Sequence, residues 1–338
     1  METIAIAKKQ KNYSISLLRL IAMLFIILCH FLQYYGIELA WWFNVGVQMF
    51  FCISGFLYAN KKIDSAVDFI GGNLQKILIP YFCFLIPTIA LYFAFASDAI
   101  TMHSVVSALV PKGVIKGIEH LWFIPYILLC YLITPYLYAL AEKMRKTKWH
   151  VFCLLFFALI IYGQALSLVF NSFFSFDKIF CYLFGYFAAV FLQEYKERLY
   201  KPLVLFLTAV TILLNGIRIY CVYIGNFRFP GFSFFQDYAH AFLGITIVLL
   251  FSLFVKIKNK KMILDLSDKY SFYIYLVHQL FILSPFTLLT ATPYMILNWF
   301  ITIIAILISA IILKFISQIA DKYFTMIVNR IKEKAVLN

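Results

Sequence analysis

The chain contains a succession of apolar runs, each about 20 residues long, and this pattern constrains its fold more than any other feature. A run of that length forms an α-helix that crosses the roughly 30 Å hydrocarbon core of a bilayer. Of the 338 residues, 64% are hydrophobic and only 13% are charged, whereas soluble domains have about 45–50% apolar and 25% charged residues. The sequence therefore predicts an all-α polytopic integral membrane protein, with no stretch left for a separate soluble catalytic domain.

Ten spans are predicted, and the basic residues give them an orientation. With the N-terminus in the cytoplasm, 24 of the 29 lysines and arginines fall on the cytoplasmic side, as the positive-inside rule requires, so both termini are expected inside. The excess charge thus reflects topology and contact with the lipid bilayer, and we expect no nucleic-acid partner. The predicted spans are 15–35, 43–60, 77–96, 120–140, 150–169, 174–193, 202–222, 233–255, 270–290 and 294–317.

The whole chain, 1–338, is expected to form a single transmembrane domain. Residues 1–13 are short and basic and precede an apolar run without a small-residue cleavage site, which predicts a cytoplasmic N-terminal segment and a retained first span. Residues 318–338 alternate apolar and charged side chains. They are expected to form a cytoplasmic amphipathic tail, either as the end of the last helix or as an interfacial helix.

Two ionisable residues, Arg19 and His30, lie inside the first predicted span. Eleven positions separate them, which is about three helical turns, so both side chains share one face and lie roughly 16 Å apart along the axis. Ionisable groups inside a membrane helix cost at least ~2.5 kcal/mol each and usually mark a site or a pathway. The predicted orientation places Arg19 near the cytoplasmic face and His30 deeper, toward the outer leaflet.

Two further histidines are candidates for chemistry, because a histidine near pH 7 can take a proton from a hydroxyl and return it to a leaving group. His120 opens the fourth predicted span and His278 lies inside the ninth. The alternative for a membrane histidine is a hydrogen bond between helices, and for His278 the two readings are equally supported. The remaining histidines are expected to be structural or solvated: His103, His150 and His240.

Three residues are candidates for binding a nucleotide-bearing donor. Lys76 lies before the third predicted span and can contact a phosphate, while Trp122 and Tyr126 can stack on a sugar or a base. Each has a plainer interpretation as an interfacial anchor. Arg218 and Arg228 are weaker candidates for contact with an anionic acceptor.

The second span is expected to pack closely against the first. Gly46 and Gly55 permit close approach of the backbones, and Ser54 can donate a hydrogen bond across the contact. Asn44 and Gln48 are one turn apart and are expected to line a cavity near His30. The seven cysteines fall mostly inside apolar runs without a C-x-x-C pair, which favours buried thiols over disulfides or metal ligands.

Four blocks, in order, resemble the acyltransferase family 3 membrane proteins. They are the Arg19…His30 spacing, the stretch from Gly46 to Phe56, the stretch from His120 to Tyr126, and the stretch from Ser271 to His278. The resemblance covers essentially the whole chain, in a form without the esterase-like domain that some relatives append. No GxSxG, HExxH or P-loop motif and no metal-ligand cluster accompanies them in the sequence.

The resemblance implies transfer of an acyl group, commonly acetyl from acetyl-CoA, to a sugar hydroxyl of an envelope glycan. By that analogy His30 is the base or the transient acyl carrier, Arg19 steadies a donor phosphate, and His120 and His278 are site residues. It implies acyl-CoA as a donor substrate rather than a tightly bound cofactor, and a glycan or lipid-linked sugar as the acceptor. It also implies glycan-assembly proteins as partners and a bacterial cytoplasmic membrane as the location.

Two other classes of function stay open at this point. In the first, the chain is a transporter or flippase for an envelope-glycan precursor or an organic anion, and Arg19 and His30 line its path. In the second, the chain is a structural partner in a glycan-assembly complex without activity of its own. Release of free coenzyme A thiol distinguishes an acyltransferase from a transporter, whereas His30→Ala would abolish an enzyme and leave a structural role intact.

Overall fold

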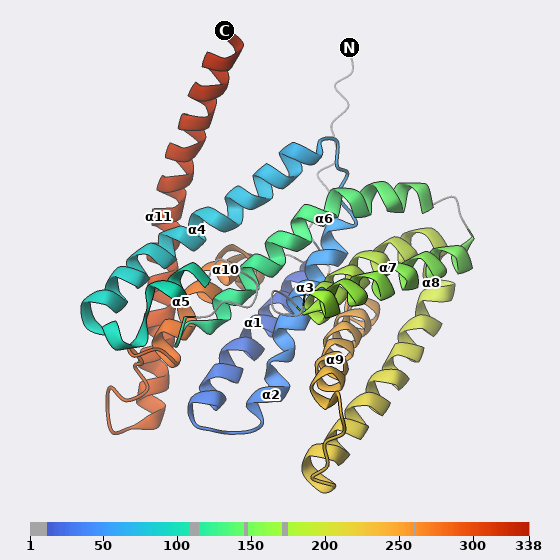
Figure 1. Ribbon diagram of the computed structural model, residues 1–338, viewed down its shortest axis with the longest axis horizontal. Helices are drawn as coiled ribbons and strands as arrows, with labels where there is room; N and C mark the ends of the chain where they lie inside the picture. The colour runs from blue at the N-terminus through green and yellow to red at the C-terminus, as the bar shows by residue number, and fades with distance from the viewer. Residues whose placement is uncertain are drawn as a thin grey trace.

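The computed structural model describes residues 12–107, 115–144, 148–170, 175–257, 259 and 261–337, and these ranges contain helices and no strand (Figure 1). The first helix begins where the Asn12 side chain accepts a hydrogen bond from the backbone N–H of Ser14. The main helices are α1 (Tyr13–Tyr34), α2 (Ala40–Phe43), α3 (Val45–Tyr58), α4 (Ala66–Phe95), α5 (Met102–Ser107), α6 (Phe123–Met144), α7 (Trp149–Val169), α8 (Phe176–Ile219), α9 (Phe232–Phe254), α10 (Met262–Ile282) and α11 (Met295–Leu337). Short helical turns, η1 (Ser97–Ala99), η2 (Glu119–Trp122) and η3 (Tyr220–Ile224), complete them.

The described part of the chain contains nine helical stretches that are long and apolar enough to cross a membrane. The expected all-α polytopic fold is therefore confirmed, and the nine stretches correspond to nine of the ten predicted spans. The exception is α10, whose first turns carry Asp265, Asp268 and Lys269. These charges keep α10 below the hydropathy of the other spans.

The predicted span at 270–290 is wrong in its second half. Helix α10 begins earlier, at Met262, and ends at Ile282. Beyond it the chain turns, and the Ser284 hydroxyl accepts a hydrogen bond from the backbone N–H of Phe286. Pro285 has no N–H to continue a helix, so apolar composition alone overestimated its length.

Helix α10 nevertheless runs through the bundle beside α1 and in the same direction. Arg19 pairs with Asp268 and, eleven residues later, the His30 ring lies against the His278 ring. Along this contact the residue numbers of α1 and α10 increase in the same direction, so the two helices are parallel. The first and ninth spans of a ten-span topology must cross the membrane in the same direction, and the contacts agree with that order.

The sixth and seventh predicted spans belong to one continuous helix, α8, where a connecting loop was expected between 193 and 202. The two halves still lie side by side, because Phe180 and Thr211 both contact Phe242 of α9. Thirty-one residues of straight helix are about 46 Å long, so both contacts require the chain to reverse direction between them. Figure 1 shows the bend in α8.

The predicted tail continues α11 without a break. This helix runs from Met295 to Leu337 and projects beyond the rest of the bundle in Figure 1. Of the two alternatives for 318–338, the structure therefore supports the end of the last helix up to Leu337. Asn338 and residues 1–11 of the predicted N-terminal segment lie outside the described residues.

Helix α3 lies at the centre of the bundle and packs through glycines. A side chain at Gly46 would meet the carbonyl oxygen of Ala22 in α1, which confirms the expected close approach. Gly55 was also expected to contact α1, but it faces the backbone of Tyr182 in α8 instead. No hydrogen bond joins Ser54 to α1 among the residues that the structure describes.

Candidate functional site

Three histidines meet where α1, η2 and α10 come together. His30 comes from α1, His120 from η2 and His278 from α10. The ring centroids of His30 and His278 are 5.1 Å apart, and those of His120 and His278 are 4.7 Å apart. The structure thus brings together three residues that lie as much as 248 positions apart in the sequence and that were singled out separately.

The histidine cluster borders a cavity of about 380 Å³. His30 and His120 line it directly, while His278 is completely buried behind them. Asn44 also lines it, as expected, but Gln48 is buried against Gly244 of α9 instead. The other lining residues are Ile26, Cys29, Gln33, Ala40, Trp41, Val47, Glu119, Trp122, Tyr275 and Gln279.

Hydrogen bonds define the proton positions on two of the rings. Nδ1 of His30 lies 3.0 Å from Oε1 of Gln33, and Nδ1 of His278 lies 2.6 Å from the carbonyl oxygen of Tyr275. Both partners are acceptors, so in the neutral imidazole each Nδ1 carries the proton and each Nε2 keeps its lone pair. The Nε2 atom of His278 is buried and has no hydrogen-bond partner among the described residues.

His120 has a different environment, because both of its ring nitrogens face protein oxygens. Nδ1 lies 2.5 Å from Oε1 of Gln279, and Nε2 lies 3.1 Å from the carbonyl oxygen of Leu276. The same Gln279 oxygen accepts the backbone N–H of His120, at 2.8 Å. Neither ring nitrogen is left for a substrate, and this geometry favours a positioning role that joins η2 to α10.

Replacing Gln33 by leucine is expected to slow acyl transfer by at least about tenfold. Without the Gln33 acceptor, the His30 proton is no longer held on Nδ1, and a fraction of the rings present Nε2–H where a lone pair is needed. The measurement is kcat in proteoliposomes, with Gln33→Glu as the matched variant that keeps an acceptor oxygen. Equal rates for the leucine variant and the wild type would contradict the role of Gln33.

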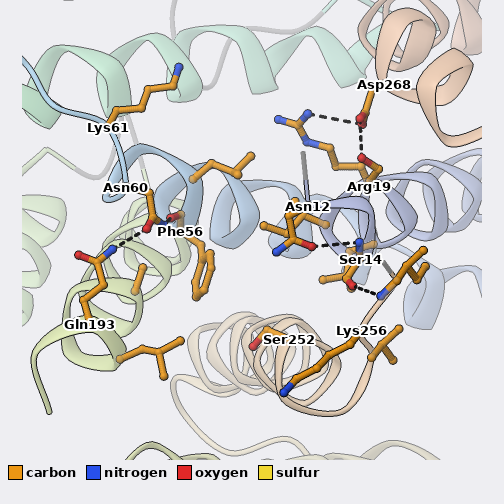
Figure 2. Close-up of a pocket in the computed structure, with 18 residues that line it drawn as sticks. Asn12, Ser14, Arg19, Phe56, Asn60, Lys61, Gln193, Ser252, Lys256 and Asp268 are labelled. Carbon is orange, nitrogen blue, oxygen red and sulfur yellow. Dashed lines mark hydrogen bonds and ion pairs between the residues drawn. The ribbon is translucent and has the colours of Figure 1, made fainter. Parts of the chain in front are cut away.

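A second, larger cavity of about 740 Å³ surrounds Arg19 at the other end of α1 (Figure 2). A guanidinium nitrogen of Arg19 lies 3.6 Å from Asp268, whose other oxygen accepts the hydroxyl proton of Ser16 at 2.6 Å. The Arg19 side chain is 33% exposed. Arg19 and His30 thus share one face of α1, as predicted, and that face lies against α10, but the two residues lie in two separate cavities.

Lys61 and Lys256 approach this Arg19 cavity from other sides, as Figure 2 shows. Burial lowers the pKa of Lys61, and the nearby cations Lys76 and Arg19 lower it further. A bound anion would oppose both effects and favour the charged form. An adjoining hollow, of about 460 Å³, shares Lys61 with the Arg19 cavity and extends it.

The four residues expected to bind the donor do not form one pocket. Arg19 lines the Arg19 cavity, and Lys76 is exposed on α4 nearby. Trp122 instead lines the histidine cavity. Tyr126 is buried and lines neither of these two cavities, and its hydroxyl accepts a hydrogen bond from the backbone N–H of Ser175 at 2.7 Å.

The other candidates of the sequence lie elsewhere. His103 and His150 are exposed, and His240 is buried in α9 with Nδ1 3.2 Å from the guanidinium of Arg218, so all three agree with the expected structural or solvated roles. His240 is therefore a helix-contact residue and not solvated. Arg228 is exposed. Five of the seven free cysteines are buried, and within the described ranges no group of histidine, cysteine, aspartate or glutamate side chains is arranged to hold a metal ion.

Sequence reasoning missed Gln33, Gln279, Asp268 and Lys61. Gln33 follows His30 by three positions on one helix, so helical spacing alone was a usable signal. Asp268 was a detectable charge beside a predicted span. The partners of Gln279 and Lys61 depend on contacts between distant helices, which one sequence does not specify.

The fold and the site define a multi-pass membrane protein with a histidine cavity and a basic cavity at opposite ends of one helix pair. The chain belongs to the acyltransferase domain family, whose sequence profile matches residues 12–317. The expected family membership is therefore confirmed, and the protein is an acyltransferase by membership. Neither the curated proteins nor the solved structures contain a significant match to the chain.

Proposed function

We propose that the protein transfers an acyl group, in the simplest case acetyl from acetyl-CoA, to a hydroxyl of a cell-surface or secreted polysaccharide. The observation that carries this proposal is the hydrogen bond between His30 Nδ1 and Gln33, which in the neutral ring leaves a lone pair on Nε2. The ring lines a cavity large enough for a sugar hydroxyl. The bacterial cytoplasmic membrane is the proposed location.

The Arg19 cavity is the proposed site of the coenzyme A phosphates. Its cations Arg19, Lys61 and Lys256 come from three segments, and arginine forms bidentate hydrogen bonds to phosphate oxygens. The carboxylate of Asp268 holds Arg19 at 3.6 Å, which is a long ion pair that a phosphate can replace. The distribution of lysine and arginine assigns this end of the bundle to the cytoplasm, where acyl-CoA is made.

The proposed reaction transfers the acyl carbon from sulfur to oxygen. The His30 Nε2 atom takes the proton of the acceptor hydroxyl as the oxygen attacks the thioester carbonyl carbon. The carbon–sulfur bond breaks, and His30 returns the proton to the leaving thiolate. The His278 ring lies behind the cavity with its centroid 5.1 Å from that of His30, and its unpartnered Nε2 atom offers a second acceptor for a proton next to His30.

In this proposal the acyl group passes from the Arg19 cavity to the histidine cavity, which are separate. Arg19 and His30 are roughly 16 Å apart along the helix, and Met23 and Ile26, between them in the sequence, are both buried. Positioning a thioester beside a base supplies much of the barrier reduction for such a transfer. A site with few polar residues is therefore sufficient.

Replacing Arg19 by alanine is expected to raise KM for acyl-CoA by about tenfold while kcat falls less, because the loss of one phosphate contact weakens donor binding. The measurement is steady-state release of coenzyme A thiol from the purified protein in proteoliposomes. Arg228→Ala, an exposed arginine away from both cavities, is the control. An unchanged KM in Arg19→Ala would remove the donor role of this residue.

The proposed function is tested by mass spectrometry of the envelope glycans in cells with and without the gene. Loss of an acetyl-sized mass on deletion, restored by the wild type and not by His30→Ala, is the expected result. A transporter would leave the thioester intact, so thiol release by the purified protein separates the two classes. Unchanged acylation of every envelope glycan would overturn the proposal.

A further inference from the structure

Two lysines and a tyrosine meet on the side of α10 that faces α11. The Nζ atom of Lys314 in α11 lies 4.6 Å from the centre of the Tyr270 ring, and the Nζ atom of Lys269 lies 5.4 Å from the same centre. The two ammonium groups are also close enough to interact with each other. We call Lys269, Tyr270 and Lys314 the lysine pair site.

Within the described part of the chain, no ion pair joins Lys269 or Lys314 to a carboxylate. Asp268 precedes Lys269 but faces α1, where it contacts Ser16 and Arg19. Lys314 is only 9% exposed. Lys269 is exposed, so only one of the two charges is withdrawn from water, but the two ammonium groups still repel each other, and an anion between them would remove that repulsion.

The height of the site along α11 matches a lipid headgroup. Lys314 follows Met295, the first residue of α11, by nineteen positions, which is about 28 Å of helix. That length nearly equals the roughly 30 Å hydrocarbon core. Lys269 is also adjacent to Asp268, the partner of Arg19, so the site lies at the end of the bundle assigned to the cytoplasm.

The surroundings favour a lipid over a soluble anion. Neither Lys269 nor Lys314 lines the Arg19 cavity or the hollow that adjoins it. Near Lys314, α11 exposes Ile311, Ile312 and Phe315, which are 54%, 52% and 64% exposed and would contact acyl chains in a bilayer. Basic pockets between membrane helices on the cytoplasmic side are suited to anionic headgroups.

We propose that Lys269, Tyr270 and Lys314 bind the phosphate of an anionic phospholipid in the cytoplasmic leaflet. The two ammonium groups contact the phosphate oxygens, and the acyl chains follow the apolar face of α11. The site is separate from both cavities and does not depend on the chemistry proposed for them.

The test uses the full-length protein and native mass spectrometry, with phosphatidylglycerol or phosphatidylcholine added to the detergent-purified protein. Wild type is expected to retain phosphatidylglycerol in preference to phosphatidylcholine. Lys269→Gln/Lys314→Gln is expected to bind phosphatidylglycerol roughly tenfold to thirtyfold more weakly. Lys322→Gln, an exposed lysine on the same helix, is the matched control and is expected to bind as the wild type does.

Two further variants and two soluble competitors complete the test. Lys269→Gln alone changes an exposed residue and replaces the double variant if that variant does not fold, while Lys269→Arg/Lys314→Arg is expected to restore binding. Equal phosphatidylglycerol binding by wild type and the glutamine variants would overturn the proposal. Displacement of the lipid by millimolar inorganic phosphate or coenzyme A would overturn it as well, since it would assign the site to a soluble phosphate.

Discussion

Replacing His30 by alanine is expected to lower acyl transfer by roughly a thousandfold or more. The ring lines the histidine cavity with a free Nε2 atom, and loss of a general base typically costs 10²–10⁴-fold in rate. A role as transient acyl carrier would make the loss at least as large. The measurement is thiol release from acyl-CoA by purified protein in proteoliposomes, together with acylation of the glycan in cells.

The control for this variant is His103→Ala, which changes an exposed histidine. Both proteins are expected to insert and purify equally, because the His30 side chain is only half-buried and its hydrogen bond is to Gln33 on the same helix. His278→Ala provides a comparison within the cluster. Glycan acylation at the wild-type rate in His30→Ala would end its assignment as the base.

The largest effect on stability is expected from Gly185→Leu. A side chain at Gly185 would overlap the carbonyl oxygen of Cys52, and the facing Gly55 leaves equally little room against Tyr182. Backbone atoms cannot move aside as a flexible side chain can, so α3 and α8 must separate. We expect a loss of about 3 kcal/mol or more and an apparent Tm lower by roughly 5–10 °C.

Gly216→Leu is the matched control, because Gly216 lies on the same helix and has open space around it. The measurement is thermal unfolding of the purified proteins in detergent, with yield of monodisperse protein as a second readout. The control is expected to resemble wild type in both. If Gly185→Leu is as stable as Gly216→Leu, the close contact between α3 and α8 does not determine stability.

The sequence predicted the helical class and most of the span positions because apolar length is a direct requirement of the bilayer. The predicted spans were wrong where a charged stretch lies inside a packed helix. The charged start of α10 lies against α1 through Asp268, and the basic stretch between the two halves of α8 remains helical. Neither outcome depends on hydropathy, so neither was accessible from it.

The candidate site was partly predictable for a similar reason. Arg19 and His30 share a face because helical geometry is fixed, and both do face α10. Whether His120, His278 or Trp122 would lie near Arg19 or His30 depended on how distant helices pack. In the structure Arg19 lines one cavity, while His30, His120 and Trp122 line another. The roles of Gln33 and Gln279 depend on hydrogen-bond partners that a single sequence does not name.

The parallel pairing of α1 and α10 also has a consequence for biosynthesis. Ser16 and Asp268 are 252 positions apart, and a ribosome adds about 5–20 residues per second. Roughly 13–50 seconds therefore pass between the synthesis of α1 and that of α10, which supplies Asp268 to Arg19 and His278 to His30. During that interval the membrane holds an arginine without its carboxylate, and both cavities stay incomplete until one of the last helices is in place.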